Sequence, residues 1–199
     1  MNSRVVGFAL CAVAVLATNA VQAAPPQRNS FASYDASVPT TNPIGRLFGF
    51  SASPIPRSVV SYPTKLKPGS IVVSTSERRL YLVLGNGEAV KYGIGVGRDG
   101  FSWSGTSTVA SKREWPDWTP PDEMLKRRPD LPHHMEGGPE NPLGARALYL
   151  GSTLYRIHGS NEPYTIGQQV SSGCIRLTNE DIIDLYARVR VGATVIVLR

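Results

Sequence analysis

Several stretches after residue 69 carry the hydrophobic pattern of β-strands and predict that the folded part of the chain is built mainly from strands. Residues 70–75 and 79–84 are rich in β-branched and aliphatic side chains, as expected of buried strands. The sequence Gly85-Asn86-Gly87 follows as a tight-turn signal, and residues 89–96 then alternate apolar and small side chains. Residues 79–96 are therefore predicted to form a β-hairpin.

Three further strands are predicted closer to the C-terminus, at residues 145–150, 153–158 and 193–198. A helix is expected to begin at Thr178 or Asn179, because acidic side chains fill the first turn after this capping signal. Apolar side chains recur through it at helical spacing. They are Ile182, Leu185, Tyr186 and Val189. The predicted class is mainly β, a barrel or sandwich with one helix in its C-terminal region and a loop-rich insertion.

The loop-rich insertion is predicted at residues 102–144, where the chain loses any regular hydrophobic period. Its one helical signal is a short segment around residues 122–127. Long irregular segments of compact domains often form lids or binding walls. Trp103, Trp115 and Trp118 all lie in the insertion. These tryptophans either line a substrate cleft or supply the small core of the insertion, and the sequence leaves both interpretations open.

Gly93, Gly95 and Gly97 fall at every second position of the predicted hairpin strand and so lie on one of its faces. Such a face predicts that another part of the molecule packs closely against the backbone there. The spacing also resembles that of a phosphate loop, but no helix follows it, so a nucleotide site is not favoured.

The N-terminal third of the chain is predicted to lie outside the folded domain. Arg4 precedes a short apolar run, and Val21-Gln22-Ala23 offers small residues where a signal peptidase would cut. Residues 1–23 are predicted to be a signal peptide, with an uncleaved anchor as the alternative. Residues 24–68 are rich in Pro, Ser, Thr and Asn and predict a flexible tether. The domain itself is expected at residues 69–199.

Removal of the signal would leave Cys174 as the single cysteine, since Cys11 lies in the apolar run. A lone cysteine in an exported domain is a free thiol with a function, an intermolecular bridge or a buried inert side chain. The chain has a formal net charge of +6. That charge fits either an anionic partner or a solvated basic surface, and export argues against nucleic acid.

Cys174 has polar neighbours and a histidine 16 positions before it, at His158. A cysteine attacks as its thiolate, so a nearby base is needed, and His158 is the candidate. Gly173 allows close approach of a ligand to the backbone, and amides next to a nucleophile are common oxyanion donors. The histidines lack the spacing of zinc ligands, so no metal site is predicted.

These residues resemble the YkuD-type L,D-transpeptidases of bacterial cell walls. The resemblance rests on His158-Gly159-Ser160 together with the segment Ser171-Ser172-Gly173-Cys174-Ile175-Arg176-Leu177. It extends over residues 69–199 and includes Asn141-Pro142-Leu143-Gly144. The resemblance implies an exported, periplasmic enzyme that acts on peptidoglycan stem peptides and uses no cofactor.

The resemblance also implies roles for individual residues. Cys174 would attack the carbonyl of the third stem-peptide residue, expelling the terminal D-Ala, while His158 would accept the thiol proton. The carbonyl of Gly159 would orient the imidazole, and the amides of Gly173 and Cys174 would form the oxyanion hole. The residues expected to contact substrate are Arg176, Ser171, Ser172 and Trp118.

One departure from the family pattern is Ser172, which stands where the commonest form has histidine. We expect activity to be retained, because His158 keeps the role of base. The acyl acceptor is left open between a second stem peptide and an outer-membrane protein. An L,D-carboxypeptidase that uses water and a non-catalytic peptidoglycan-binding protein are the alternatives, and a monomer is expected.

Overall fold

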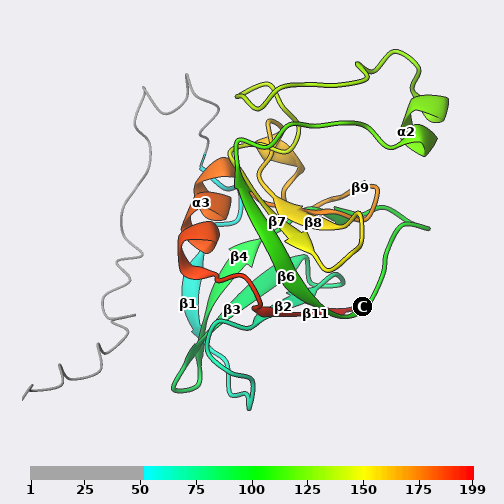
Figure 1. The fold of residues 1–199 in the computed structure, drawn as a ribbon. Helices are drawn as coiled ribbons and strands as arrows, with labels where there is room; N and C mark the ends of the chain where they lie inside the picture. The colour runs from blue at the N-terminus through cyan, green and yellow to red at the C-terminus, as the bar shows by residue number, and fades with distance from the viewer. Residues whose placement is uncertain (1–51) are drawn as a thin grey trace, which may run out of the picture. The chain divides into compact units, whose positions relative to one another are not determined.

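The computed structural model describes residues 52–199, which form a mainly β domain with two α-helices and a short 3-10 helix (Figure 1). The first strands are β1 (Ser58–Ser61), β2 (Ile71–Ser74), β3 (Arg79–Gly85), β4 (Glu88–Gly93), β5 (Val96–Gly97) and β6 (Gly105–Glu114). The later ones are β7 (Arg146–Leu150), β8 (Arg156–His158), β9 (Gln169–Ser171), β10 (Ile175–Arg176) and β11 (Thr194–Leu198). The helices are α2 (Asp122–Arg127), η1 (Pro163–Thr165) and α3 (Asn179–Arg188).

Nine of these strands form one sheet in the order β1-β4-β3-β2-β11-β6-β7-β8-β10. The last strand, β11, lies in the middle of this sheet, parallel to β2 and antiparallel to β6. The last two strands of the sheet, β8 and β10, are parallel to each other. Strands β5 and β9 form a separate parallel pair. The order places the β1–β4 region and the β7–β10 region on opposite sides of β11.

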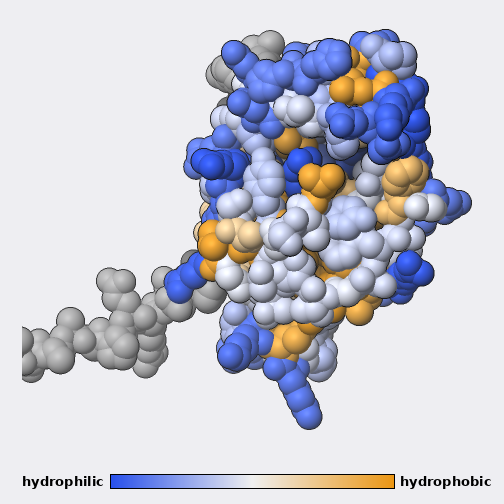
Figure 2. All heavy atoms as spheres, turned by 45° about the vertical axis from the view of Figure 1, so that its right-hand side comes forward, coloured by the Kyte–Doolittle hydropathy of each residue, from blue (hydrophilic) through white to orange (hydrophobic). Residues whose placement is uncertain are grey.

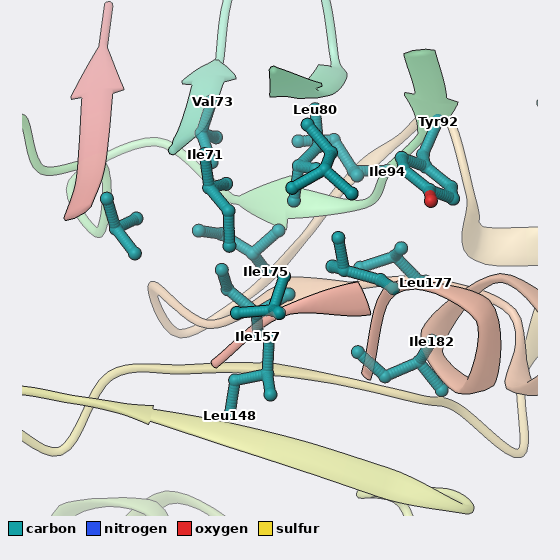
Figure 3. Packing of buried hydrophobic residues seen from close by; sticks show 14 of the residues in the cluster. Ile71, Val73, Leu80, Tyr92, Ile94, Leu148, Ile157, Ile175, Leu177 and Ile182 are labelled. Carbon is teal, nitrogen blue, oxygen red and sulfur yellow. The ribbon is translucent and has the colours of Figure 1, made fainter. Parts of the chain in front are cut away.

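The hydrophobic core lies between these two regions (Figure 3). Ile71, Val73 and Leu80 come from one region, and their side chains point toward Leu148 and Ile157 from the other. All five are fully buried. Helix α3 packs on β7 and adds further apolar side chains to the same core. Burying aliphatic side chains of this size contributes about 1.5–3 kcal/mol each.

The predicted hairpin and the predicted C-terminal helix are both confirmed. Strands β3 and β4 pair antiparallel, from Arg79 opposite Gly93 to Gly85 opposite Glu88, and the turn between them lies at Asn86 and Gly87. At the start of α3, Thr178 is the N-cap, and its Oγ1 accepts a hydrogen bond of 3.2 Å from the amide of Asp181. The expected class, mainly β with one main helix near the C-terminus, is therefore confirmed.

Two sequence-based boundaries need correction. Part of the predicted tether, residues 58–61, is strand β1, which pairs with β4 at the edge of the sheet. Its four residues are too few to show a clear period. Part of the predicted insertion, Gly105–Glu114, is the ten-residue strand β6, which pairs with both β11 and β7. Only Val109 is buried along it, so hydrophobic alternation could not reveal it. The short helix expected around residues 122–127 is present as α2.

The predicted signal peptide and most of the predicted tether, up to residue 51, lie outside the described residues. Among residues 52–199, none of the helices has the length and hydropathy needed to cross a membrane.

Candidate active site

The candidate site lies on one face of the parallel pair β8 and β10. Ile157 is paired with Ile175, and both side chains are buried in the core. Successive side chains of a strand point to opposite faces, so the residues on either side of this pair point away from the core. His158 is paired with Arg176 on that outer face. Cys174 directly precedes β10, and so lies diagonally across from His158.

His158 is buried, and its ring is held by the backbone of the next residue. Its Nδ1 lies 2.6 Å from the carbonyl oxygen of Gly159. A carbonyl can only accept, so Nδ1 carries the proton and Nε2 is left as a proton acceptor. Burial and, after it, the charge of Arg176 together lower the pKa of His158 from 6.5 to about 3, against the opposing effect of backbone hydrogen bonds to Gly159 and Leu143. The imidazole is therefore neutral at physiological pH.

Cys174 is a free, half-buried thiol. Its Sγ donates a long hydrogen bond of 3.9 Å to the carbonyl oxygen of Leu154. Burial raises the pKa of the Cys174 thiol, while the charge of Arg156, its hydrogen bonding and the charge of Arg176 oppose that rise. With a neutral imidazole and a protonated thiol, the resting pair carries no net charge.

The turn that presents Cys174 is held by Ser171. The Ser171 hydroxyl donates a hydrogen bond of 2.6 Å to the carbonyl of Cys174 and accepts one of 3.1 Å from the amide of Gly173. Gly173 has a φ of +105°. A Cβ at this position would lie 2.6 Å from a ring carbon of Tyr155. The turn therefore requires glycine both for its backbone conformation and for space.

An aromatic pair supports the same turn from the insertion side. The indole Nε1 of Trp103 donates a hydrogen bond of 2.9 Å to the carbonyl of Gly173. Its ring stacks on that of Tyr155 with centroids 4.7 Å apart. Trp103 thus contacts the turn before Cys174 directly.

The segment with alternating glycines packs against both arms of this turn. Gly95 exchanges two backbone hydrogen bonds of 2.9 Å with Arg176, after the cysteine, and β5 pairs with β9, before it. A Cβ at Gly97 would lie 2.7 Å from the carbonyl of Phe101 and 3.3 Å from Cα of Gly173. The close packing predicted for this face is confirmed, and the packed partner includes the backbone around Cys174.

A buried asparagine organises the backbone next to His158. Asn179, the first residue of α3, accepts through Oδ1 a hydrogen bond of 2.8 Å from the amide of Ala145. A Cβ at Gly144 or at Gly159 would lie 2.2 Å or 2.3 Å from the same oxygen. The backbone of Gly159, whose carbonyl holds the His158 ring, therefore packs directly against the Asn179 side chain, and no larger residue fits at position 159.

Arg176 forms an ion pair within the domain. Its Nη1 lies 2.9 Å from a carboxylate oxygen of Glu162, in the segment that follows His158. Its Nε is buried without a hydrogen-bond partner in the described part of the chain. Arg176 therefore connects the two halves of the site, and the charge it presents there is partly offset by Glu162.

The structure separates the expected substrate contacts into two groups. Ser171 is buried and its hydroxyl is hydrogen-bonded within the turn, so it supports the backbone of Cys174. Ser172, in contrast, is partly exposed. Trp118 is only 8% exposed and pairs through its backbone with Met135, inside the insertion. That position favours a role in the small core of the insertion over contact with substrate.

The expected oxyanion donors also differ from each other. The Gly173 amide donates to Ser171, as described above. For the Cys174 amide, no hydrogen bond to another residue between 52 and 199 is found. Of the two amides expected to bind an oxyanion, the amide of Cys174 is the one left available.

Two residues of the site, Tyr155 and Arg156, were not singled out from the sequence. The signal for Arg156 was strand alternation, because it lies two positions before His158 and so on the same face of β8. Tyr155 gave no such signal, since its contact with Gly173 depends on the turn conformation. Among the described residues, no group of three or more His, Cys, Asp and Glu side chains could hold a metal ion.

The space-filling view brings forward the side of the domain on which β9 lies (Figure 2). The upper part, which includes α2, is mainly hydrophilic with a small hydrophobic group at its right, and a shadowed recess separates it from the mixed surface below. The insertion therefore adds a polar wall to the domain.

The fold and the site together define a mainly β domain with a neutral histidine at the end of one strand and a cysteine directly before the parallel strand next to it. The sequence profile of the YkuD family, the L,D-transpeptidase catalytic domain, matches residues 68–197. The chain belongs to this family.

Relatives and solved structures agree with that assignment. The "Probable L,D-transpeptidase ErfK/SrfK" of Escherichia coli K12 is 41% identical over 150 residues, which cover 71% of this chain and 47% of the relative. The "Probable L,D-transpeptidase YbiS" of the same organism is 40% identical over 134 residues, 63% of this chain and 43% of the relative. An "L,D-transpeptidase from Mycobacterium smegmatis" shares the fold, with a TM-score of 0.52 at 19% identity over 65% of this chain and 58% of that one. The chain spans about half the length of the curated relatives it matches.

Proposed function

We propose that this protein is a peptidoglycan L,D-transpeptidase with Cys174 as the nucleophile and His158 as the base. The observation that carries the proposal is the hydrogen bond of 2.6 Å between His158 Nδ1 and the carbonyl of Gly159. It fixes the tautomer in which Nε2 is free to accept a proton. In combination with the lone thiol directly before the neighbouring strand, this supports a Cys/His acyl-transfer site.

The first half-reaction forms a thioester. The thiol proton of Cys174 passes to His158 Nε2 as Sγ attacks the carbonyl carbon of the third stem-peptide residue. The amide of Cys174 donates to the resulting oxyanion, a contribution of about 3 kcal/mol per donor in comparable sites. When the tetrahedral intermediate collapses, the C–N bond breaks and the imidazolium returns its proton to the amine of the departing D-Ala.

The second half-reaction transfers the acyl group. An acceptor amine attacks the thioester carbonyl and loses a proton to His158, and the C–S bond breaks. The sulfur leaves as a thiolate and takes up that proton, so the enzyme is regenerated and a new amide is formed. The proposed acceptor is a side-chain amine of a second stem peptide, giving a 3→3 cross-link, or an amine of an outer-membrane protein.

The neutral resting pair affects how the first step proceeds. Burial lowers the pKa of His158 to about 3 and raises the pKa of Cys174. A free thiolate-imidazolium pair is therefore costly before substrate binds. Proton transfer is expected to accompany C–S bond formation, so Cys174 should be less reactive toward small electrophiles than an activated thiolate.

The remaining parts of the proposal concern location and binding. We place the protein in the periplasm after export, in agreement with the signal predicted at residues 1–23. Its partners are stem peptides, and nucleic acid is not among them. Arg176 and Ser172 border the nucleophile and are the proposed contacts to the substrate.

Mass spectrometry with a disaccharide-tetrapeptide tests the proposal. Incubation should give a thioester adduct on Cys174, release of D-Ala and 3→3 cross-linked dimers, and a Cys174→Ala variant should give none of these while remaining folded. Tripeptide without dimers would identify an L,D-carboxypeptidase, in which water is the acceptor. Binding to cell-wall sacculi without adduct or D-Ala release would identify a non-catalytic binding protein and contradict the proposal.

A further inference from the structure

Arg156 has a different environment from Arg176, although both border the site. The pairing of Ile157 with Ile175 and of His158 with Arg176 fixes the register of the two strands. One step back along both strands, Arg156 comes beside Cys174. Adjacent strands are about 4.8 Å apart, so a guanidinium at this position is within reach of the sulfur. Arg176 in turn is next to the imidazole.

The charge of Arg156 is not offset by an acidic partner. In residues 52–199 no carboxylate forms an ion pair with it, whereas Arg176 is paired with Glu162 at 2.9 Å. The Arg156 guanidinium lies over the ring of Tyr149, 5.4 Å from its centroid. Its Nε is buried and has no hydrogen-bond partner in the described residues. A buried donor without a partner is unusual and is expected to have an acceptor in some functional state.

The two arginines therefore act differently when the proton moves from Sγ to Nε2. Negative charge then develops beside Arg156, whose charge is uncompensated, and positive charge develops beside Arg176, whose charge is partly offset by Glu162. The same asymmetry appears in the pKa values, because Arg156 lowers the pKa of Cys174 more than Arg176 does, whereas Arg176 lowers the pKa of His158 more than Arg156 does.

We propose that Arg156 is a further catalytic residue, which stabilises the thiolate of Cys174 as the thiol proton is transferred to His158. It does so by its charge and by donating a hydrogen bond from the guanidinium to the sulfur. The proposal relies on the proposed function only in taking Cys174 as the nucleophile. The charged groups that act on the thiol are Arg156 and Arg176, and the strand register places His158 diagonally across from it.

The test measures alkylation of Cys174 by iodoacetamide as a function of pH, without any peptidoglycan. The full chain is used, and the modified fraction of the Cys174 peptide is read by mass spectrometry, so that Cys11 does not interfere. In Arg156→Met the midpoint of the alkylation profile should rise by about one pH unit, with roughly tenfold slower alkylation at neutral pH. Arg156→Lys keeps the charge and should retain most of the wild-type profile.

Arg190→Met is the matched control, because it removes the same charge from an exposed position. Circular dichroism verifies that each variant is folded, and Arg156→Gln serves as a second neutral variant if Arg156→Met is not. An unchanged alkylation profile in a folded neutral variant would overturn the proposal. So would a variant in which only the KM for tetrapeptide rises, since that result assigns Arg156 to substrate binding. Failure of the proposed transpeptidase activity would leave the alkylation result intact, so the two are distinguishable.

Discussion

The hydroxyl of Ser171 donates a hydrogen bond of 2.6 Å to the carbonyl oxygen of Cys174. Because the same hydroxyl accepts from the Gly173 amide, one buried side chain holds both ends of the turn that carries Cys174. Ser171→Ala removes both bonds and leaves a buried amide and a carbonyl without this partner. We expect a loss of about 1–3 kcal/mol in the free energy of unfolding. Urea denaturation measures it, and Ser172→Ala, next to it but partly exposed, should stay close to wild type.

Gly173→Ala should destabilise the domain more than an equivalent substitution at an open position. Gly100 also has a positive φ, of +80°, but a Cβ there would meet nothing within 4 Å. Gly100→Ala therefore isolates the backbone strain, about 1 kcal/mol. At Gly173 the new methyl group also meets Tyr155 at 2.6 Å. Thermal unfolding should rank the two variants in that order. Adding Tyr155→Ala to Gly173→Ala should recover part of the loss, and strictly additive effects would contradict this explanation.

The buried, neutral His158 should make the domain sensitive to acid. Its pKa is 6.5 when unfolded and about 3 when folded, so between these values the unfolded chain binds more protons. Stability contributed by the neutral imidazole is therefore present above pH 6.5 and is lost as the pH falls toward 3. The slope approaches about 1.4 kcal/mol per pH unit. Denaturation curves of wild type and His158→Gln between pH 4 and 7 should converge toward low pH. Parallel pH dependences would show that His158 is not the group responsible.

The ion pair of Arg57 with Asp181 should fasten the segment that precedes β1 to α3. Its two atoms lie 2.9 Å apart, and the Asp181 side chain is only 3% exposed. Burial raises the pKa of Asp181, and Arg57 opposes that rise. Arg57→Met leaves this carboxylate buried without its salt bridge and should cost about 3–5 kcal/mol at neutral pH. Combining Arg57→Met with Asp181→Asn should cost less than the two single changes together, as measured by a double-mutant cycle in urea. A coupling near zero would exclude the ion pair as the cause.

Hydrophobic periodicity predicted the parts of the fold that bury one regular face. The β3–β4 hairpin and helix α3 belong to this group. It could not predict β6, a ten-residue strand with a single buried side chain that is held by hydrogen bonds to neighbours on both sides. It also missed β1, whose four residues form the edge of the sheet. Strands whose stability comes from pairing rather than burial leave little trace in the order of apolar residues.

The same distinction applies to the candidate site, where the sequence predicts some residues and only the folded structure reveals others. Cys174 and His158 could be singled out from local chemistry, because each has a recognisable neighbourhood along the chain. The register that brings Arg156 beside the thiol is a property of two strands and could not be read from either alone. The role of Trp103 depends on the Gly173 carbonyl, which is far from it along the chain. The buried positions of Ser171 and Trp118 likewise followed from packing.

The central position of β11 affects how the protein can be made. This strand is formed by residues 194–198, and it joins the half of the sheet that ends at β2 to the half that begins at β6. Because the sheet order of residues 52–199 places this strand between the two halves, the sheet cannot become continuous during synthesis until residues 194–198 have left the ribosome. Pairing between such distant segments also folds slowly. A nascent chain that stays incompletely folded in this way remains threadable through a translocation channel, which the proposed export requires.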